Sequence, residues 1–343
     1  MAETDVISID AAQQLATAAL IANRTAPDIA ARVASALVAS EAAGQPGHGL
    51  SRVPSYSAQA QSGKVDGFAR PSLERVTGSL VRVDGAFGFA YPALDLALDA
   101  LPEMARGNGI AMAAVRRSHH FGQGGLHCER LADQGLVALV FGNAPKSIAP
   151  WGAKEPLFGT NPIAFAAPVP GSASLVIDLA VSRVAKGKIM AAEKAGRPIP
   201  EGWALDRDGN PTTDAAAAME GTMLPIGDAK GAALAMMVEV MAAALVGSSF
   251  GFEASGLFSG EGDPPNLGQT IIAIDPGLSS GGTYGERIAA LMTAMAGAEG
   301  ARLPGSRRIG ARLKAEREGM EVPRLILDEV RKLAGGQSLS RLD

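Results

Sequence analysis

The sequence is poor in cysteine and aromatic residues and has no excess of basic residues, and several classes of protein depend on these. Its 343 residues include one cysteine, Cys128, which excludes an intramolecular disulfide framework and any multi-cysteine metal site. Aromatic residues make up only 4%, and the formal net charge is -4. Few rings are therefore available to stack on bases, and no basic surplus neutralises phosphates, so we expect no nucleic-acid partner.

Signals for export and membrane insertion are also missing. The first five residues, MAETD, lack the charged and then apolar start of a signal peptide, so the expected compartment is the cytoplasm. Residues 231–250 form an apolar run in which Glu239 is the one charged residue. A carboxylate at the centre of a bilayer costs about 2.5 to 3.5 kcal/mol, so no membrane contact is expected. We predict a buried soluble helix that ends at Gly247 and packs between a sheet and a subunit interface.

Two phosphate-binding fingerprints do not occur. No Gly-x-Gly-x-x-Gly run joins an early strand to a helix, which argues against the usual dinucleotide-binding fold. The Gly-x-x-x-x-Gly-Lys-Ser/Thr pattern of phosphoryl-transfer proteins is absent as well.

The hydrophobic pattern predicts a mixed α/β fold. Two helices are expected in residues 8–43, separated near 23–27, and both ends of the chain read as helical. We predict a helical domain of residues 1–75 with 300–343, and a mixed-sheet region of 76–299 that is one unit or two. The predicted strands are 80–83, 110–115, 136–141, 163–167, 175–179 and 270–274, and the further helices are 92–106, 125–134, 285–299 and 310–334.

The histidines are few and grouped. Three of four lie in residues 119–127, and histidine titrates closest to neutral pH, so proton transfer is indicated. His119 and His120 are adjacent and should point to opposite sides, which leaves at most one of them catalytic. Metal binding has no support from a His-Glu-x-x-His pattern or a carboxylate cluster, so no metal is expected. Structural hydrogen bonding is the alternative.

His48 and Arg52 are spaced to share one face of a helix that starts near Gly49. A guanidinium binds a carboxylate with two hydrogen bonds while an imidazole gives or takes a proton, so the pair suits an acidic substrate. The alternative, which the spacing alone favours, is a helix start with a solvent-facing histidine and an arginine in a surface ion pair.

Three further segments carry groups suited to a nucleotide. Residues 178–188 combine Asp178 with Ser182 and two lysines, residues 224–231 form a turn ahead of the apolar helix, and residues 303–308 form a basic turn. Each could contact ribose or phosphate, and each could be an ordinary strand end or loop.

Six motifs in order resemble the type-2 malate/L-lactate dehydrogenase family over residues 8–330. They are Gly-His-Gly-x-x-Arg-x-x-x-Tyr (47–56), Ser-His-His-Phe-Gly (118–122), Phe-Gly-Thr-Asn-Pro (158–162), Asp-x-Ala-x-Ser (178–182), Asp-x-Asp-Gly-Asn-Pro-Thr-Thr-Asp (206–214) and Leu-Pro-Ile-Gly-x-x-Lys-Gly (224–231). The resemblance implies a nicotinamide-binding sheet domain of the non-Rossmann kind and a homodimer. It also implies an NAD(P)-dependent enzyme acting on small 2-oxo or 2-hydroxy carboxylates (malate, lactate or sulfolactate type) or on cyclic imine carboxylates such as piperideine-2-carboxylate and pyrroline-2-carboxylate.

The same resemblance assigns roles. His48 is the candidate proton donor with His120 as its rival, Arg52 binds the substrate carboxylate, and Thr160 touches substrate. NADPH is favoured over NADH because Arg307 and Arg308 could pair with a 2′-phosphate. The cofactor-binding residues are His120, Phe121, Gly122, Asp178, Leu179, Ala180, Asp228, Ala229, Lys230, Gly305, Ser306, Arg307 and Arg308.

Gly47 departs from the family pattern, which commonly has serine there. The missing hydroxyl leaves open whether His48, His120 or a water supplies the proton. An imine substrate can arrive already protonated, which relaxes the need for a proton donor. Two hypotheses for a different class of function remain. One is a non-catalytic nicotinamide-binding dimer, and the other is a metal-assisted hydrolase or lyase.

Overall fold

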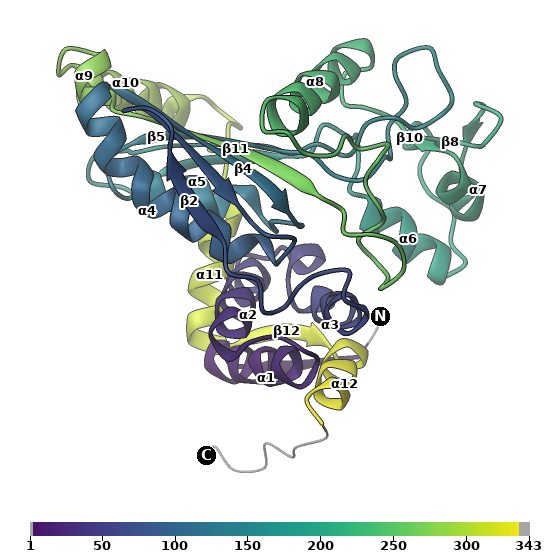
Figure 1. Cartoon of the computed structure of the whole chain (residues 1–343). Helices are drawn as coiled ribbons and strands as arrows, with labels where there is room; N and C mark the ends of the chain where they lie inside the picture. The colour runs from purple at the N-terminus through teal and green to yellow at the C-terminus, as the bar shows by residue number, and fades with distance from the viewer. Residues whose placement is uncertain (1–2, 336–343) are drawn as a thin grey trace.

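Both ends of the chain build one helical layer. The computed structural model describes residues 3–335, so residues 336–343 of the predicted helical domain lie outside the described part. Strand β1 (Thr4–Ile7) pairs antiparallel with β12 (Met320–Pro323), which joins the two ends (Figure 1). The helices of this layer are α1 (Ile9–Ala22), α2 (Pro27–Ala42), α3 (Val53–Ser62), α11 (Ser306–Glu318) and α12 (Arg324–Leu333).

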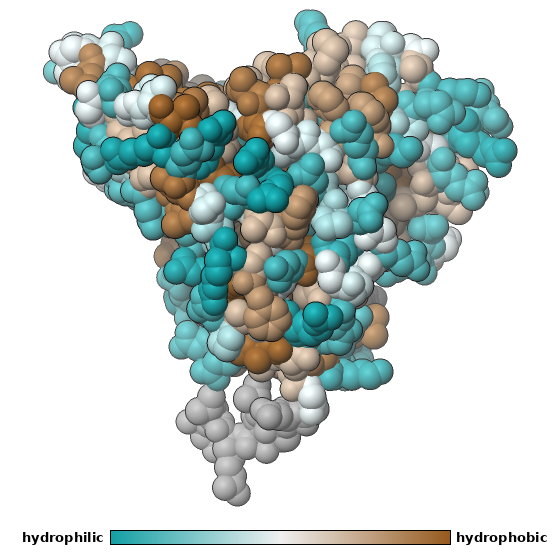
Figure 2. Space-filling view, in the orientation of Figure 1, coloured by the Kyte–Doolittle hydropathy of each residue, from teal (hydrophilic) through white to brown (hydrophobic). Residues whose placement is uncertain are grey.

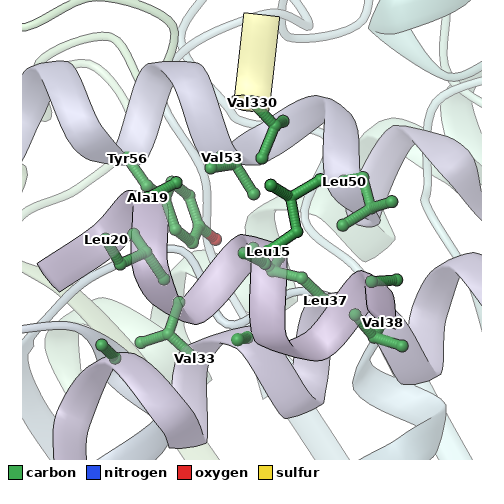
Figure 3. Close-up of a cluster of buried hydrophobic side chains, with 14 of the residues drawn as sticks. Leu15, Ala19, Leu20, Val33, Leu37, Val38, Leu50, Val53, Tyr56 and Val330 are labelled. Atoms are coloured by element: carbon green, nitrogen blue, oxygen red, sulfur yellow. The ribbon is translucent and has the colours of Figure 1, made fainter. Parts of the chain in front are cut away.

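Local signals fix where these helices begin. The Ser8 hydroxyl accepts a hydrogen bond from the Ala11 amide at 3.2 Å and caps α1, while Pro27 opens α2 with a φ already suited to a helix. Their apolar faces meet in a shared core, where Figure 3 shows Tyr56 of α3 among Leu15 and Val53. The prediction of two helices in residues 8–43 is confirmed.

A seven-stranded mixed sheet forms the second part. Its order is β2-β3-β4-β11-β5-β6-β7, and only the β3 and β4 pairing is parallel. This topology differs from an all-parallel Rossmann sheet, and the predicted mixed α/β class is confirmed. The strands are β2 (Ser72–Arg75), β3 (Leu80–Asp84), β4 (Ile110–Ser118), β11 (Leu267–Ile274), β5 (Val137–Gly142), β6 (Ile163–Ala167) and β7 (Leu175–Leu179).

Helices cover the two faces of this sheet unequally. Helices α4 (Ala90–Asn108) and α5 (Gly124–Ala132) share one core with the strands, in which Leu94, Leu131 and Ile271 are fully buried. On the other face, Val238 and Ala242 pack on Phe141 of β5. The sheet starts at Ser72, on the N-terminal side of the boundary predicted at residue 75, and α9 (Pro276–Ser279) and α10 (Tyr284–Gly297) follow β11.

A smaller unit lies to one side of the sheet (Figure 1). It has its own buried cluster, which includes Ile148, Val181 and Ile199. Its elements are α6 (Lys186–Lys194), α7 (Ala215–Glu220) and a three-stranded sheet of β8 (Ala204–Leu205), β9 (Pro211–Thr212) and β10 (Thr222–Met223).

The apolar run at 231–250 is a helix, as predicted, but it is buried on one side only. Helix α8 (Ala229–Glu239) continues as a π-helical turn, η3 (Val240–Ala244), and Gly247 follows with φ +74° as the expected stop. The opposite side exposes Leu234, Met236, Met237, Val240 and Leu245. Within residues 3–335, none of the helices combines the length and the apolar character needed to cross a bilayer.

The C-terminal stretch predicted as helical over 310–334 contains a strand instead. Gly319, at φ +80°, ends α11, and β12 separates it from α12. A Cβ on Gly319 would lie 3.0 Å from the Ile7 carbonyl oxygen, so this close pairing with β1 favours glycine. The pairing of β12 with β1 therefore overrides the helical pattern of the sequence in residues 320–323.

Candidate active site

Two histidines from distant segments stack face to face. The rings of His48 and His120 have centroids 5.3 Å apart and an interplanar angle of 16°. His120 follows the end of β4, and its Nδ1 lies 2.6 Å from the hydroxyl of Tyr56 on α3. The fold therefore brings both predicted proton-transfer candidates to one place.

His48 and Arg52 do not share an α-helix, contrary to the prediction of a helix starting near Gly49. They end two consecutive 3₁₀ turns, η1 (Pro46–His48) and η2 (Leu50–Arg52). Glu41 causes the break, because its Oε2 accepts the Leu50 amide at 2.8 Å and would lie 2.0 Å from a Cβ on Gly49. Helix α3 begins after these turns, at Val53.

Arg52 is a half-buried cation whose Nη1 end is enclosed by the protein. Its Nε donates to the Gly47 carbonyl at 2.7 Å, and its Cζ lies 4.6 Å from the ring centroid of Phe258. Its Nη1 is buried and has no hydrogen-bond partner among the described residues. Burial lowers the pKa of Arg52, which marks the cost of holding this charge away from water. An anion at Nη1 would offset that cost.

Both stacked histidines are neutral near pH 7. Burial, with a smaller contribution from Arg52, lowers the pKa of His48 to about 4. Burial, with Arg52 and the neighbouring rings of His48 and His119, holds the pKa of His120 well below its usual range. A bound carboxylate would counter the Arg52 charge and raise both values.

The other two histidines hold the structure around this pair. His119 Nε2 lies 2.9 Å from Gln59 Oε1, and its ring packs edge-on against Tyr56 and Phe89. His127 Nε2 donates to the Phe121 carbonyl at 2.8 Å. Across residues 3–335, no three His, Cys, Asp or Glu side chains gather as a metal site.

Glu239 organises the segment that contains Thr160. Its carboxylate is buried and accepts hydrogen bonds from Asn161 Nδ2 at 2.9 Å, Gly251 N at 3.0 Å, and Gly159 N and Asn143 Nδ2 at 3.3 Å each. Two of these donors flank Thr160. The role of Glu239 was missed in the sequence, although a lone carboxylate in an apolar run is a signal that it needs buried donors.

The predicted cofactor segments converge near the C-terminal end of β7. Asp178 Oδ2 accepts the Gly125 amide at 2.8 Å and so caps the first turn of α5. A Cβ on Gly125 would lie 2.9 Å from Arg308 Nη1, which brings the start of α11 to the same point. Burial raises the pKa of Asp178, with the Gly125 amide and Arg308 acting against it.

The turn before α8 adjoins the same strand end. The Ile226 amide donates to the Val181 carbonyl at 2.8 Å, and Arg183 forms an ion pair with Asp228 at 2.6 Å. The turn before α8 therefore adjoins the residues that follow β7, while the starts of α5 and α11 meet at Asp178 on that strand.

These residues fit a nicotinamide dinucleotide. Helices α5 and α11 begin beside Asp178, and helix starts offer backbone amides to phosphate. Arg308 is buried with its Nε lacking a partner in the described structure, whereas Arg307 is exposed. Gly122, at φ +69°, packs closely on Tyr91, since a Cβ there would lie 2.6 Å from Tyr91 Oη.

Phe121 lies deeper than its predicted place beside the nicotinamide suggests. Its ring is buried in the core and packs against Gly142, where a Cβ would lie 2.2 Å from the ring. A cavity of about 900 Å³ lies between the helical layer and α4 and α5, and Phe121 and Gln123 line it. The stacked histidines and Arg52 do not line this cavity.

Comparisons with known proteins identify the family of this chain. The family model for malate/L-lactate dehydrogenase matches residues 7–331. The (2R)-3-sulfolactate dehydrogenase (NADP(+)) of Chromohalobacter salexigens is 51% identical over 96% of this chain and 98% of its own length.

Two solved structures share the fold over nearly the whole chain. The Δ1-piperideine-2-carboxylate reductase of Pseudomonas syringae pv. tomato superposes with a TM-score of 0.91 at 39% identity, over 96% of this chain and all of that one. The sulfolactate dehydrogenase of Methanocaldococcus jannaschii gives 0.88 at 27% identity, over 97% of each chain. The resemblance seen in the six motifs is confirmed: this chain belongs to the malate/L-lactate dehydrogenase family and is an NAD(P)-dependent oxidoreductase.

Proposed function

We propose that the protein interconverts a small 2-oxo acid and its 2-hydroxy acid with NADPH, and that the acid carries a second anionic group, as sulfopyruvate and sulfolactate do. The observation that carries this proposal is the stacked pair of His48 and His120 beside Arg52. The Nη1 of Arg52 is buried and has no hydrogen-bond partner among the described residues. The 51% identity to an NADP-dependent sulfolactate dehydrogenase supports the substrate class.

Each of the three side chains has a task in this proposal. Arg52 binds the substrate carboxylate through its open edge and orients the oxo group. The cofactor, when bound, supplies the hydride for reduction and accepts it in the reverse direction. His120 or His48 moves the proton to and from the substrate oxygen, and Thr160 contacts the substrate.

Tyr56 lets His120 change its protonation state. Its hydroxyl lies 2.6 Å from His120 Nδ1 and can act either way: it donates to Nδ1 when that nitrogen carries no proton, and it accepts from Nδ1–H when the ring is charged. Its own proton then turns toward the His120 carbonyl at 3.4 Å or Tyr91 Oη at 3.5 Å. An anionic substrate raises the pKa of the ring at the moment when the proton is needed.

The cofactor residues divide into three roles. We propose that His120 and Gly122 border the nicotinamide, with Phe121 supporting them from the core. The exposed Arg307 pairs with the 2′-phosphate of NADPH, while Arg308 is held beside Asp178. The remaining contacts come from Leu179, Ala180, Asp228, Ala229, Lys230, Gly305 and Ser306.

The second candidate substrate is a cyclic imine carboxylate. The reductase of Pseudomonas syringae pv. tomato favours it, and Gly47 fits it because a protonated imine needs less help from the histidines. Arg52 would bind the carboxylate in the same way.

We further propose a cytoplasmic homodimer. Helix α8 and η3 expose Met236, Met237 and Val240 together with two leucines, and Figure 2 shows apolar surface over this region. Soluble monomers rarely leave such a patch uncovered, and a second copy would bury it. Light scattering on wild type and on Met236→Glu tests the dimer, which the variant should weaken.

The deciding experiment follows the absorbance of the reduced cofactor with NADPH and NADH in parallel. The substrates are sulfopyruvate, pyruvate, oxaloacetate and piperideine-2-carboxylate, and the test variants are His120→Gln and His48→Asn. Turnover of an oxo acid by wild type that falls about 10²- to 10⁴-fold in these variants supports the proposal. Turnover of the imine alone supports the second candidate, and no turnover of any of the four substrates overturns both.

A further inference from the structure

Phe258 lies over the face of Arg52 although it comes from a distant segment. Its ring centroid is 4.6 Å from Arg52 Cζ, within the range of a cation–π contact. Phe258 is 44% exposed, so its ring is not part of an apolar core. The contact with the guanidinium adds to the partial burial of the ring.

Lys64 fixes the segment that carries Phe258. Its ammonium, on a residue only 3% exposed, donates to the carbonyls of Gly256 at 2.5 Å and Glu261 at 2.6 Å, with Ser259 at 3.4 Å. A buried lysine that spends its three donors on backbone carbonyls acts as a clamp on that backbone.

Helix α3 provides two further contacts to this segment. Gln59 donates its Nε2 to the Leu257 carbonyl at 3.0 Å, and a Cβ on Gly260 would lie 2.8 Å from the Ala58 carbonyl. Only a glycine allows that close approach without a shift. Residues 256–261 are therefore held against α3 on both sides of Phe258.

This arrangement suits an arginine that must bind an incoming anion. A carboxylate side chain beside Arg52 would occupy the edge of its guanidinium and compete with substrate. An aromatic ring stabilises the charge from the face and leaves the edge free. The Gly47 carbonyl holds Nε of Arg52, and Phe258 covers one face of the guanidinium. These two contacts fix the direction in which the unpartnered Nη1 points.

We propose that Phe258, held by Lys64, is a positioning residue that orients Arg52 for the substrate carboxylate. This rests on the role proposed for Arg52. It predicts that losing the aromatic ring weakens substrate binding and leaves cofactor binding and the chemical step unchanged.

The test compares four variants in steady-state kinetics, using whichever acid the wild-type enzyme turns over. Phe258→Leu keeps an apolar side chain without a π face and should raise KM for the acid about three- to thirtyfold, with kcat within about twofold. Phe258→Tyr should restore KM. Lys64→Met, which removes the clamp, should raise KM like Phe258→Leu.

Phe252 offers the matched control. It is similarly exposed at 47%, but it stacks on Phe250 at 5.5 Å rather than on Arg52, so Phe252→Leu should leave KM unchanged. Melting temperatures identify any variant that has failed to fold. If wild type turns over and Phe258→Leu shows a wild-type KM, the inference is wrong. If wild type turns over none of the acids, the proposed function fails instead.

Discussion

Acidification should destabilise the protein through its buried histidines, and His127 isolates one contribution. Burial lowers the pKa of His127 to about 4, while its hydrogen bond to the Phe121 carbonyl acts in the opposite direction. His127 lies outside the stacked pair, so replacing it leaves His48 and His120 in place. Replacement by glutamine keeps an amide donor for the Phe121 carbonyl.

The magnitude follows from the two titrations. A histidine with a pKa of 6.5 in the unfolded chain and about 4 in the folded one is protonated first in the unfolded chain as the pH falls. Its stabilising contribution is complete above its unfolded pKa and is lost as the pH falls through its folded pKa. Linkage gives a loss of about 2 kcal/mol between roughly pH 7.5 and pH 5.

Urea unfolding of wild type and His127→Gln measures this loss. At about pH 7.5 we expect the variant to be less stable by roughly 1 kcal/mol, because the packing of the ring is lost. By about pH 5 the difference should have moved in favour of the variant by about 2 kcal/mol. Both proteins are measured without cofactor at one protein concentration. Parallel stability curves for the two proteins across this range would refute the reasoning.

Four further changes test other parts of the site. Arg52→Lys should raise KM for the acid about tenfold or more, because an ammonium cannot bind a carboxylate with two parallel bonds; steady-state kinetics measures it. Tyr56→Phe should lower kcat about tenfold and move the kcat pH profile, since His120 Nδ1 loses its partner at 2.6 Å. Arg307→Ala should raise KM for NADPH about tenfold and leave that for NADH unchanged. Glu239→Leu should lower the free energy of unfolding by about 3 to 5 kcal/mol, because four donors lose their acceptor, and Glu239→Gln should cost less; equal losses would contradict this account.

Periodicity was enough to locate most of the elements. All six predicted strands occur, because short apolar runs such as 163–167 are bounded by glycine, proline or aspartate. The two failures have one cause. Glu41 breaks the turn at Gly49, and β1 draws residues 320–323 into a strand. Both depend on contacts outside the local helical pattern: the Glu41 side chain reaches the Leu50 amide nine residues on, and β1 lies at the opposite end of the chain.

The site was predictable as chemistry but not as geometry. The six motifs named His48, Arg52 and His120, yet nothing in their spacing indicates a ring stack between residues 72 positions apart. Phe258 has no motif at all, because its position depends on the carbonyls that Lys64 binds. A residue that acts through a neighbouring side chain can be identified only from the three-dimensional structure, which shows that neighbour.

Four of the eleven buried side-chain atoms without a hydrogen-bond partner in residues 3–335 lie in the candidate site. His48 Nδ1, Arg52 Nη1, Gln123 Oε1 and Arg308 Nε are all buried, and within residues 3–335 none has a hydrogen-bond partner. Each such group costs about 1 to 3 kcal/mol. Two of them lie beside the stacked histidines and two along the proposed cofactor segments, where the proposed function puts its substrate and its cofactor. A protein that stores this cost without its ligands should gain stability when substrate and cofactor bind, because each ligand supplies the partner that the chain leaves out.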